Sequence, residues 1–258
     1  MPHSSPPLDR SPAGRLNKPV IPRRRPIGTY TIGKRAKFEA ARTVNRADAS
    51  DSLTAELTLT AHKLTGPGFV CDFGDLAAFQ RHIEAALDHQ DLDTLLADVT
   101  DTGIAGHLHR WAAANLPVGA RGRLSEVRIL TGRPSSPPDP EAVYFRARHW
   151  LRGLPVGHKC ARPHGHAYLI TLPTGPNHGQ HLPIPAQLRA HLMAAFHGQV
   201  LNAVLPDLNP TSENLAAHLA DWLSARGLSG PTGRPYTVRV SETETTWAQF
   251  TPDAGAAA

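Results

Sequence analysis

Alternating apolar and polar residues in several short stretches predict β-strands. The stretches "TAELTLTAH" at 54–62 and "TVRVSET" at 237–243 place apolar residues at every second position. This alternation is typical of antiparallel strands that bury one face. Similar patterns give five further strand candidates, at 30–42, 125–132, 141–149, 166–172 and 247–250.

Apolar residues at a spacing of three and four predict helices between these strands. The candidates in the first half of the chain are 74–89 and 101–116, and those in the second half are 185–205 and 209–227. The last candidate has clear ends, because Thr211 or Ser212 can cap its N-terminus and Gly227 can close it. The sequence therefore predicts mixed helices and antiparallel strands.

The two halves of the chain repeat the same order of elements. The stretch "YTIGKRAKFEAAR", which ends at Arg42, is echoed about 110 residues later by "EAVYFRARH", which ends at His149. The stretch 125–132 is echoed in the same way by 236–243. We therefore predict an α+β fold of two tandem units, each with helices on one face of an antiparallel sheet. The predicted divisions are a basic tail at 1–28, an N-terminal unit at 29–131, a linker at 132–140 and a C-terminal unit at 141–252.

Composition places the chain among cytoplasmic proteins with reduced thiols. It has 258 residues, two cysteines and no apolar run near the roughly 18 residues that a membrane span needs. Residues 1–28 are rich in Pro, Ser and Arg and lack an apolar core, which predicts a disordered tail rather than a signal peptide. We expect no export and no disulfide framework.

The net charge of +5 suits an anionic partner. Several of the positive charges lie in the tail, at Arg23, Arg24 and Arg25, and the rest of the chain has no run of basic and aromatic residues for stacking bases. These features argue against nucleic acid, and a small phosphorylated substrate fits the charge as well.

The stretch "GHKCARPHGHAYLITL" at 157–172 concentrates potential metal ligands. His164 and His166 flank one residue at the start of a strand candidate, so both imidazoles point to the same face. His149 ends the preceding candidate, and antiparallel pairing would bring it alongside. Three histidines leave one tetrahedral position open, as in catalytic zinc sites. The alternative is a group of surface histidines, because short H-x-H motifs are common.

Cys160 has two possible roles beside such a site. As a fourth ligand it would make the zinc site closed and structural. As a base or nucleophile it would act as the thiolate, which a metal and the nearby Lys159 and Arg162 would favour. The spacing alone leaves both roles open.

The stretch "FRARHWLRGLPVGHKCARPHGHAY" at 145–168 resembles the metal-binding segment of the 6-pyruvoyltetrahydropterin synthase family. Its Cys-x-x-x-His-x-His spacing is closest to the bacterial 6-carboxytetrahydropterin synthase branch, and the resemblance continues through "NPTSENLAAHLADWL" and "VRVSETETTWAQF". It implies a catalytic base at Cys160 and a pterin anchor at Glu242. Glu213 is a second candidate for pterin contact, or only an acid in the first turn of its helix. The resemblance implies that zinc is held by His149, His164 and His166.

The family also carries a Leu-Asp-His sequence at the end of its first helix, where the histidine works with the cysteine. The C-terminal half has Phe-His-Gly at 196–198 instead, whereas the N-terminal half keeps Leu87, Asp88 and His89. That same half has Arg42 in place of the first zinc histidine and Thr131 in place of the glutamate. This reciprocal loss predicts an active site composed from both halves, within one chain or between neighbouring chains. The alternative is that Asp88 and His89 only cap a helix.

The resemblance implies a tunnelling fold, in which ββααββ units assemble into a barrel. The implied reaction converts 7,8-dihydroneopterin triphosphate into 6-carboxytetrahydropterin, with release of acetaldehyde and triphosphate, on the route to queuosine and other deazapurine nucleosides. Six single units would correspond to a homo-oligomer of three tandem chains. The alternatives are a pterin lyase that forms the pyruvoyl product, and a non-catalytic family member stabilised by zinc.

Overall fold

The computed structural model describes residues 27–44, 47–131, 141–174 and 180–253. The predicted linker at 132–140 and all of the predicted tail except its last two residues lie outside this range. Gly28, assigned to the tail by the sequence, is the first residue of β1.

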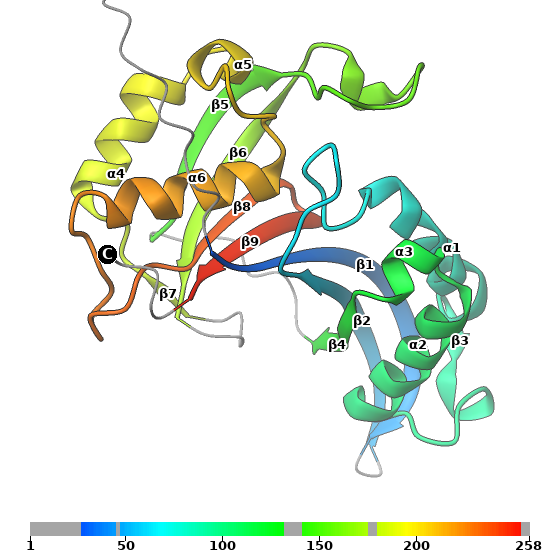
Figure 1. The fold of residues 1–258 in the computed structure, drawn as a ribbon. Coiled ribbons are helices and arrows are strands. Elements are labelled where there is room, and N and C mark those ends of the chain that lie inside the picture. The colour runs from blue at the N-terminus through cyan, green and yellow to red at the C-terminus, as the bar shows by residue number, and fades with distance from the viewer. Residues whose placement is uncertain (1–26, 45–46, 132–140, 175–179, 254–258) are drawn as a thin grey trace, which may run out of the picture.

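The strands form one sheet that runs through both halves (Figure 1). Along its main path neighbouring strands are antiparallel, in the order β4-β2-β1-β9-β8-β6-β5. Two short strands, β3 (Gln90–Asp91) and β7 (His181–Leu182), pair with β1 and β6. The long strands are β1 (Gly28–Val44), β2 (Ala47–Ala61), β4 (Leu124–Thr131), β5 (Val143–His149), β6 (His164–Pro173), β8 (Val238–Thr243) and β9 (Thr246–Pro252).

The halves are joined where β1 pairs with β9. The register runs from Gly28 opposite Pro252 to Lys34 opposite Thr246. The sequence predicted a sheet in each half, and the structure merges the two through main-chain hydrogen bonds between the first and last long strands of the described chain.

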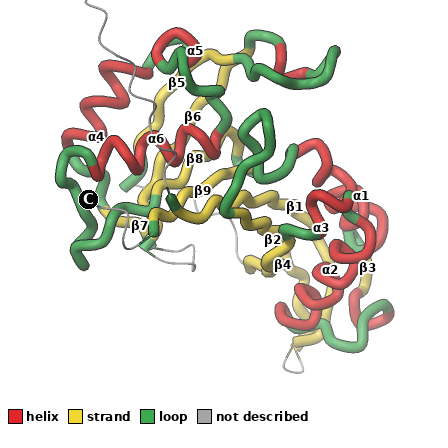
Figure 2. The backbone as a smooth tube through the Cα atoms, viewed as in Figure 1, coloured by secondary structure: helices red, strands yellow, loops and turns green. Residues whose placement is uncertain are grey.

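The helices lie over one face of this sheet in two groups (Figure 2). In the C-terminal half α6 packs on β8 and β9, and in the N-terminal half α2 packs on β4. The N-terminal group is η1 (Phe73–Leu76), α1 (Ala77–Ala86), η2 (Leu92–Thr94), α2 (Asp101–Asn115) and α3 (Val118–Arg121). The C-terminal group is η3 (Lys159–Ala161), α4 (Ala186–His191), the π-helix η4 (Leu192–Phe196), α5 (Leu201–Val204) and α6 (Ser212–Ser224).

The alternation in β2 explains how the sheet is covered. Leu53, Leu57 and Leu59 are buried in the hydrophobic core on the helix side. Glu56 points to the other face and is also buried. It accepts hydrogen bonds from Arg35 Nε at 2.7 Å, Arg128 Nη2 at 3.2 Å and Trp247 Nε1 at 3.0 Å. Because Trp247 lies on β9, this buried carboxylate also links the two halves.

The helix predicted over 185–205 is wrong in its length. The chain leaves the helix after Phe196, and Gly198 adopts a left-handed backbone with φ of 74°. The Gly198 N–H then donates to the Arg146 carbonyl, and the Arg148 N–H donates to the Gln199 carbonyl. The apolar spacing continues through this break, but pairing with β5 replaces helical hydrogen bonds there.

The elements of the C-terminal half follow in the order β5, η3, β6, β7, α4, η4, α5, α6, β8 and β9. The described N-terminal half ends instead with one long strand, β4, and adds only the two-residue β3. A mixed fold with an antiparallel sheet is therefore present, with unequal units. None of the described helices is long and apolar enough to span a bilayer.

Candidate metal centre and active-site cavity

The three predicted imidazoles meet at one end of the β5–β6 pair. His149, the last residue of β5, lies opposite His164, the first residue of β6, in the antiparallel register. His166 follows two positions later on the same face. The candidate ligand atoms of the three residues all lie within 4.8 Å of one another.

The hydrogen bonds of two of these rings leave their Nε2 atoms available for a cation. His149 Nδ1 donates to the Pro210 carbonyl at 2.8 Å, and His164 Nδ1 donates to the Arg162 carbonyl at 2.7 Å. In the neutral rings both Nε2 atoms then carry lone pairs, and they face each other at 3.1 Å. A shared cation would turn this repulsion into attraction, and a carbonyl behind a ligating histidine is usual in metal sites. The residues present therefore fit a zinc ion.

A cavity of about 730 Å³ opens beside the imidazoles and is lined by both halves of the chain. The N-terminal half contributes Lys34, Asp72 and Gln80 among others. From the C-terminal half, the predicted site residues in the wall are Cys160, His164, His166, Glu213 and Glu242.

Cys160 lies in η3, the short turn between β5 and β6. Burial raises the pKa of its thiol, and the positive charge of Lys159 acts in the opposite direction. The expectation that nearby cations favour the thiolate is therefore not met by the protein side chains alone, because desolvation outweighs them. Additional positive charge, such as a metal ion, would be needed to form the thiolate at neutral pH.

The two acidic candidates lie in different environments. Glu242 is partly buried, and its Oε2 lies 3.9 Å from His166 Nε2. Glu213 is fully buried and accepts the Val70 N–H at 3.0 Å, so it bridges to the N-terminal half. Burial raises the pKa of Glu213 to about 7. Thr211 caps the same helix by accepting the Asn214 N–H, which confirms that predicted helix start.

Asp88 and His89 lie away from this cavity. Asp88 Oδ1 accepts the Glu39 N–H at 2.9 Å, which lowers the pKa of the carboxyl, and Asp88 Oδ2 lies 2.9 Å from His89 Nδ1. The His89 side chain is 77% exposed, and neither residue is among the described residues that line the cavity. Within one chain, this pair fastens the end of α1 to β1.

Two further cavity residues were given no role by the sequence. His158 Nε2 and Asp72 Oδ2 lie 2.9 Å apart, although the residues are 86 positions apart in the chain. His158 belongs to the quoted 157–172 stretch, and its place two residues before Cys160 was the available signal. Asp72 stands just before a helix candidate, where an aspartate usually caps.

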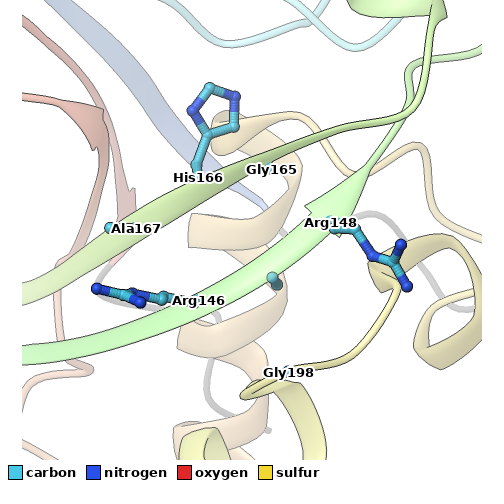
Figure 3. A pocket seen from close by; sticks show the side chains of 7 residues that line it. Arg146, Arg148, Gly165, His166, Ala167 and Gly198 are labelled. Atoms are coloured by element: carbon cyan, nitrogen blue, oxygen red, sulfur yellow. The ribbon is translucent and has the colours of Figure 1, made fainter.

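A smaller hollow of about 300 Å³ lies along the outer part of the β5–β6 pair (Figure 3). It is lined by Arg146 and Arg148 of β5, together with small residues of β6 and Gly198. His166 reaches both hollows, but Cys160 and the two glutamates line only the larger one. Cys160 and the two carboxylates, which are the candidate proton-transfer groups, therefore line the larger cavity.

Comparison with known proteins agrees with the two-unit arrangement. A family model described as 6-pyruvoyl tetrahydropterin synthase matches residues 31–136 and again 141–253. A search of curated proteins gave no match.

Among solved structures, the 6-pyruvoyl tetrahydropterin synthase of Caenorhabditis elegans matches at 22% identity, over 43% of this chain and 91% of its own, with a TM-score of 0.32. An uncharacterized protein from Wolinella succinogenes matches at 18% identity, over 86% of this chain and 97% of its own, with a TM-score of 0.22. The assignment of the family rests on the tandem match to the family model.

Proposed function

Because the chain belongs to the 6-pyruvoyl tetrahydropterin synthase family, we propose that it is a zinc-dependent 6-carboxytetrahydropterin synthase acting on 7,8-dihydroneopterin triphosphate. The observation that carries this proposal is a cluster of three imidazoles beside a cavity whose wall contains two of them, a free cysteine and two glutamates. A purely structural zinc site has no use for a free thiol in the cavity wall.

His149, His164 and His166 would hold the zinc. When bound, zinc supplies Lewis-acid polarisation of the side-chain oxygens of the substrate. Cys160, placed in the wall beside these histidines, would act as the base that removes a proton from the substrate side chain. Its raised pKa makes this role depend on the positive charge of the occupied site.

The two glutamates would fix the pterin ring. Carboxylate oxygens accept the N–H donors that a pterin presents along one edge, and Glu213 and Glu242 both line the cavity. Glu213 is the more rigid of the two, because the Val70 N–H already holds one of its oxygens.

Cations in the cavity wall support a triphosphate substrate. Lys34 from β1 joins Lys159 and Arg162 from the C-terminal half in lining the cavity. Burial, followed by repulsion from Lys159, lowers the pKa of Lys34. A polyanionic group would relieve this repulsion, so we assign the phosphate end of the substrate to these side chains.

We propose that His89 acts from a neighbouring chain, oriented by Asp88. Its exposure leaves it accessible to a second copy. In the described part of the chain the outermost strand β4 also leaves an edge to which a further copy could add, whereas residues 198–200 already pair with part of the outer edge of β5. A ring of three tandem chains would then bring the Asp-His pair of one chain to the zinc cavity of the next.

Incubating the purified zinc-loaded protein with 7,8-dihydroneopterin triphosphate and identifying the pterin product tests the proposal. We expect 6-carboxytetrahydropterin and acetaldehyde, and we expect Cys160→Ala to retain zinc while losing turnover by roughly 10²–10⁴-fold. A pyruvoyl product would move the protein to the other branch of the family. Loss of zinc from Cys160→Ala would instead favour a closed structural site.

A further inference from the structure

A continuous set of hydrogen bonds runs from the N-terminal half to the turn that carries Cys160. Asp72 Oδ1 accepts the Gly74 N–H at 2.7 Å, and Asp72 Oδ2 lies 2.9 Å from His158 Nε2. His158 Nδ1 in turn lies 3.2 Å from the Cys160 backbone nitrogen. These three hydrogen bonds therefore connect the Gly74 backbone to the Cys160 backbone through the side chains of Asp72 and His158.

The direction of these bonds fixes the tautomer of His158. A backbone N–H can only donate, so His158 Nδ1 must be the acceptor for Cys160. The ring proton therefore lies on Nε2 and is donated to Asp72. Both nitrogens of the ring are thus occupied, so His158 holds the turn rather than moving a substrate proton.

A second contact holds the turn from the C-terminal half. Its backbone is held from the C-terminal half where the Leu151 N–H donates to the Cys160 carbonyl at 2.8 Å. His158 is the N-cap of the turn and the Asp72 carboxylate holds that cap from the other half. Both side chains are largely covered, at 22% exposed for His158 and 30% for Asp72.

We propose that Asp72 and His158 form a positioning pair, through which the N-terminal half fixes the orientation of Cys160 in the cavity. The consequence of this pair for turnover rests on the proposed function, whereas its effect on the thiol does not. The N-terminal half, which has lost the zinc ligands, would then still control the reactive group of the other half.

Three substitutions separate the two bonds of His158. His158→Asn keeps an acceptor near the Nδ1 position but cannot reach Asp72, and His158→Gln keeps a donor near the Nε2 position but cannot cap Cys160. Asp72→Asn can still accept from Gly74, but its amide hydrogens would face the Nε2–H of His158. A role limited to capping predicts no effect for Asp72→Asn and only a small effect for His158→Asn.

The test measures alkylation of Cys160 by iodoacetamide against pH, resolved by peptide mass spectrometry, together with zinc content, kcat and KM. For all three variants we expect zinc to be retained and kcat to fall roughly 10–100-fold, with little change in KM. Release of the half-buried thiol to solvent should raise its labelling at pH 7.5 by up to about tenfold, because reactivity of a thiol follows its exposure. Cys71, which is buried, serves as an internal check on folding.

Asp98→Asn is the matched control, because Asp98 also caps a turn in the N-terminal half, and among the described residues its side chain accepts hydrogen bonds from Thr100 alone. It should behave as the unsubstituted protein. Cys160 labelling and kcat unchanged in Asp72→Asn would overturn the positioning pair, whatever the two His158 variants do. If the parent protein turns over no pterin, the labelling comparison still decides this inference, and only the proposed function fails.

Discussion

Both halves link their first strand to their second long helix in the same way, but the linking side chain has a different chemistry in each half. In the C-terminal half, His149 near the end of the first strand donates to the carbonyl of Pro210, just before the Thr211 cap of α6. In the N-terminal half, Arg42 of β1 donates to the carbonyl of Val99 at 3.0 Å, just before the Thr100 cap of α2. Each half therefore ties its first strand to the start of its second long helix through one buried side chain.

The difference lies in what the side chain has left to offer. After donating through Nδ1, His149 keeps an Nε2 lone pair for a metal. Arg42 has no lone pair, and its Nη1 also binds Asp101 Oδ1 at 2.8 Å. The comparison teaches that the strand-to-helix link and the metal chemistry are separable. A unit can lose its metal ligand and keep its fold, provided that another donor reaches the same carbonyl.

The largest test of this difference removes the metal ligands from the C-terminal half. His164→Ala combined with His166→Ala should reduce zinc from one per chain to none and abolish turnover, because one remaining imidazole cannot hold the ion. Metal analysis after dialysis measures this directly. Two zinc ions per chain in the unsubstituted protein, or zinc retained in the variant, would contradict the assignment of a single site to the C-terminal half.

A second test asks whether the N-terminal half supplies a catalytic group. His89→Ala should retain zinc and lower kcat by roughly 10²–10⁴-fold, as loss of a positioned acid or base does. His62→Ala is the control, because this histidine of the same half is exposed and, within the part of the chain that the structure describes, its ring bonds to Thr29 alone. Unchanged kinetics for His89→Ala would leave Asp88 and His89 with their structural role at the end of α1.

A third test uses the buried carboxyl that joins the halves at the cavity. The pKa of Glu213 is raised from 4.5 to about 7, so between these values the folded state binds more protons than the unfolded state. The stability that this group contributes is present below pH 4.5 and is lost as pH rises through 7. As pH rises from 4.5 to 8, the free energy of unfolding of Glu213→Gln should therefore increase relative to that of the parent protein by up to about 3 kcal/mol. Urea unfolding of both proteins across this range measures it, and a pH-independent difference would refute the ionisation argument.

The smallest expected effect concerns the N-terminal link. Arg42→Met should lower the free energy of unfolding by about 2 kcal/mol, because it leaves the Val99 carbonyl and Asp101 without their donor. Zinc content should not change. A double-mutant cycle with Asp101→Asn separates the ion pair from the bond to the carbonyl. No loss of stability would show that the link is dispensable in this half.

Local signals explain what the sequence could predict. The period of two placed His164 and His166 on one face, and antiparallel pairing of adjacent stretches brought His149 beside them. Thr211 marked the start of α6 because a cap is a local feature. Two contacts join segments that are distant in the sequence: the pairing of β1 with β9, and the bond between Asp72 and His158. No periodic pattern in the sequence marks either of them. The break at Gly198 was missed because the apolar spacing runs through it.

The pairing of β1 with β9 also bears on the order of the units along the gene. Gly28 and Pro252 are register partners, so a short turn between them would convert the two strands into a β-hairpin. A circularly permuted chain could then begin at Glu141 and end at Thr131, keeping each strand pairing on the main path of the sheet while the zinc-binding unit is synthesised first. The fold therefore places no constraint on which unit comes first, and a duplication followed by loss of function in either copy could reach the same architecture.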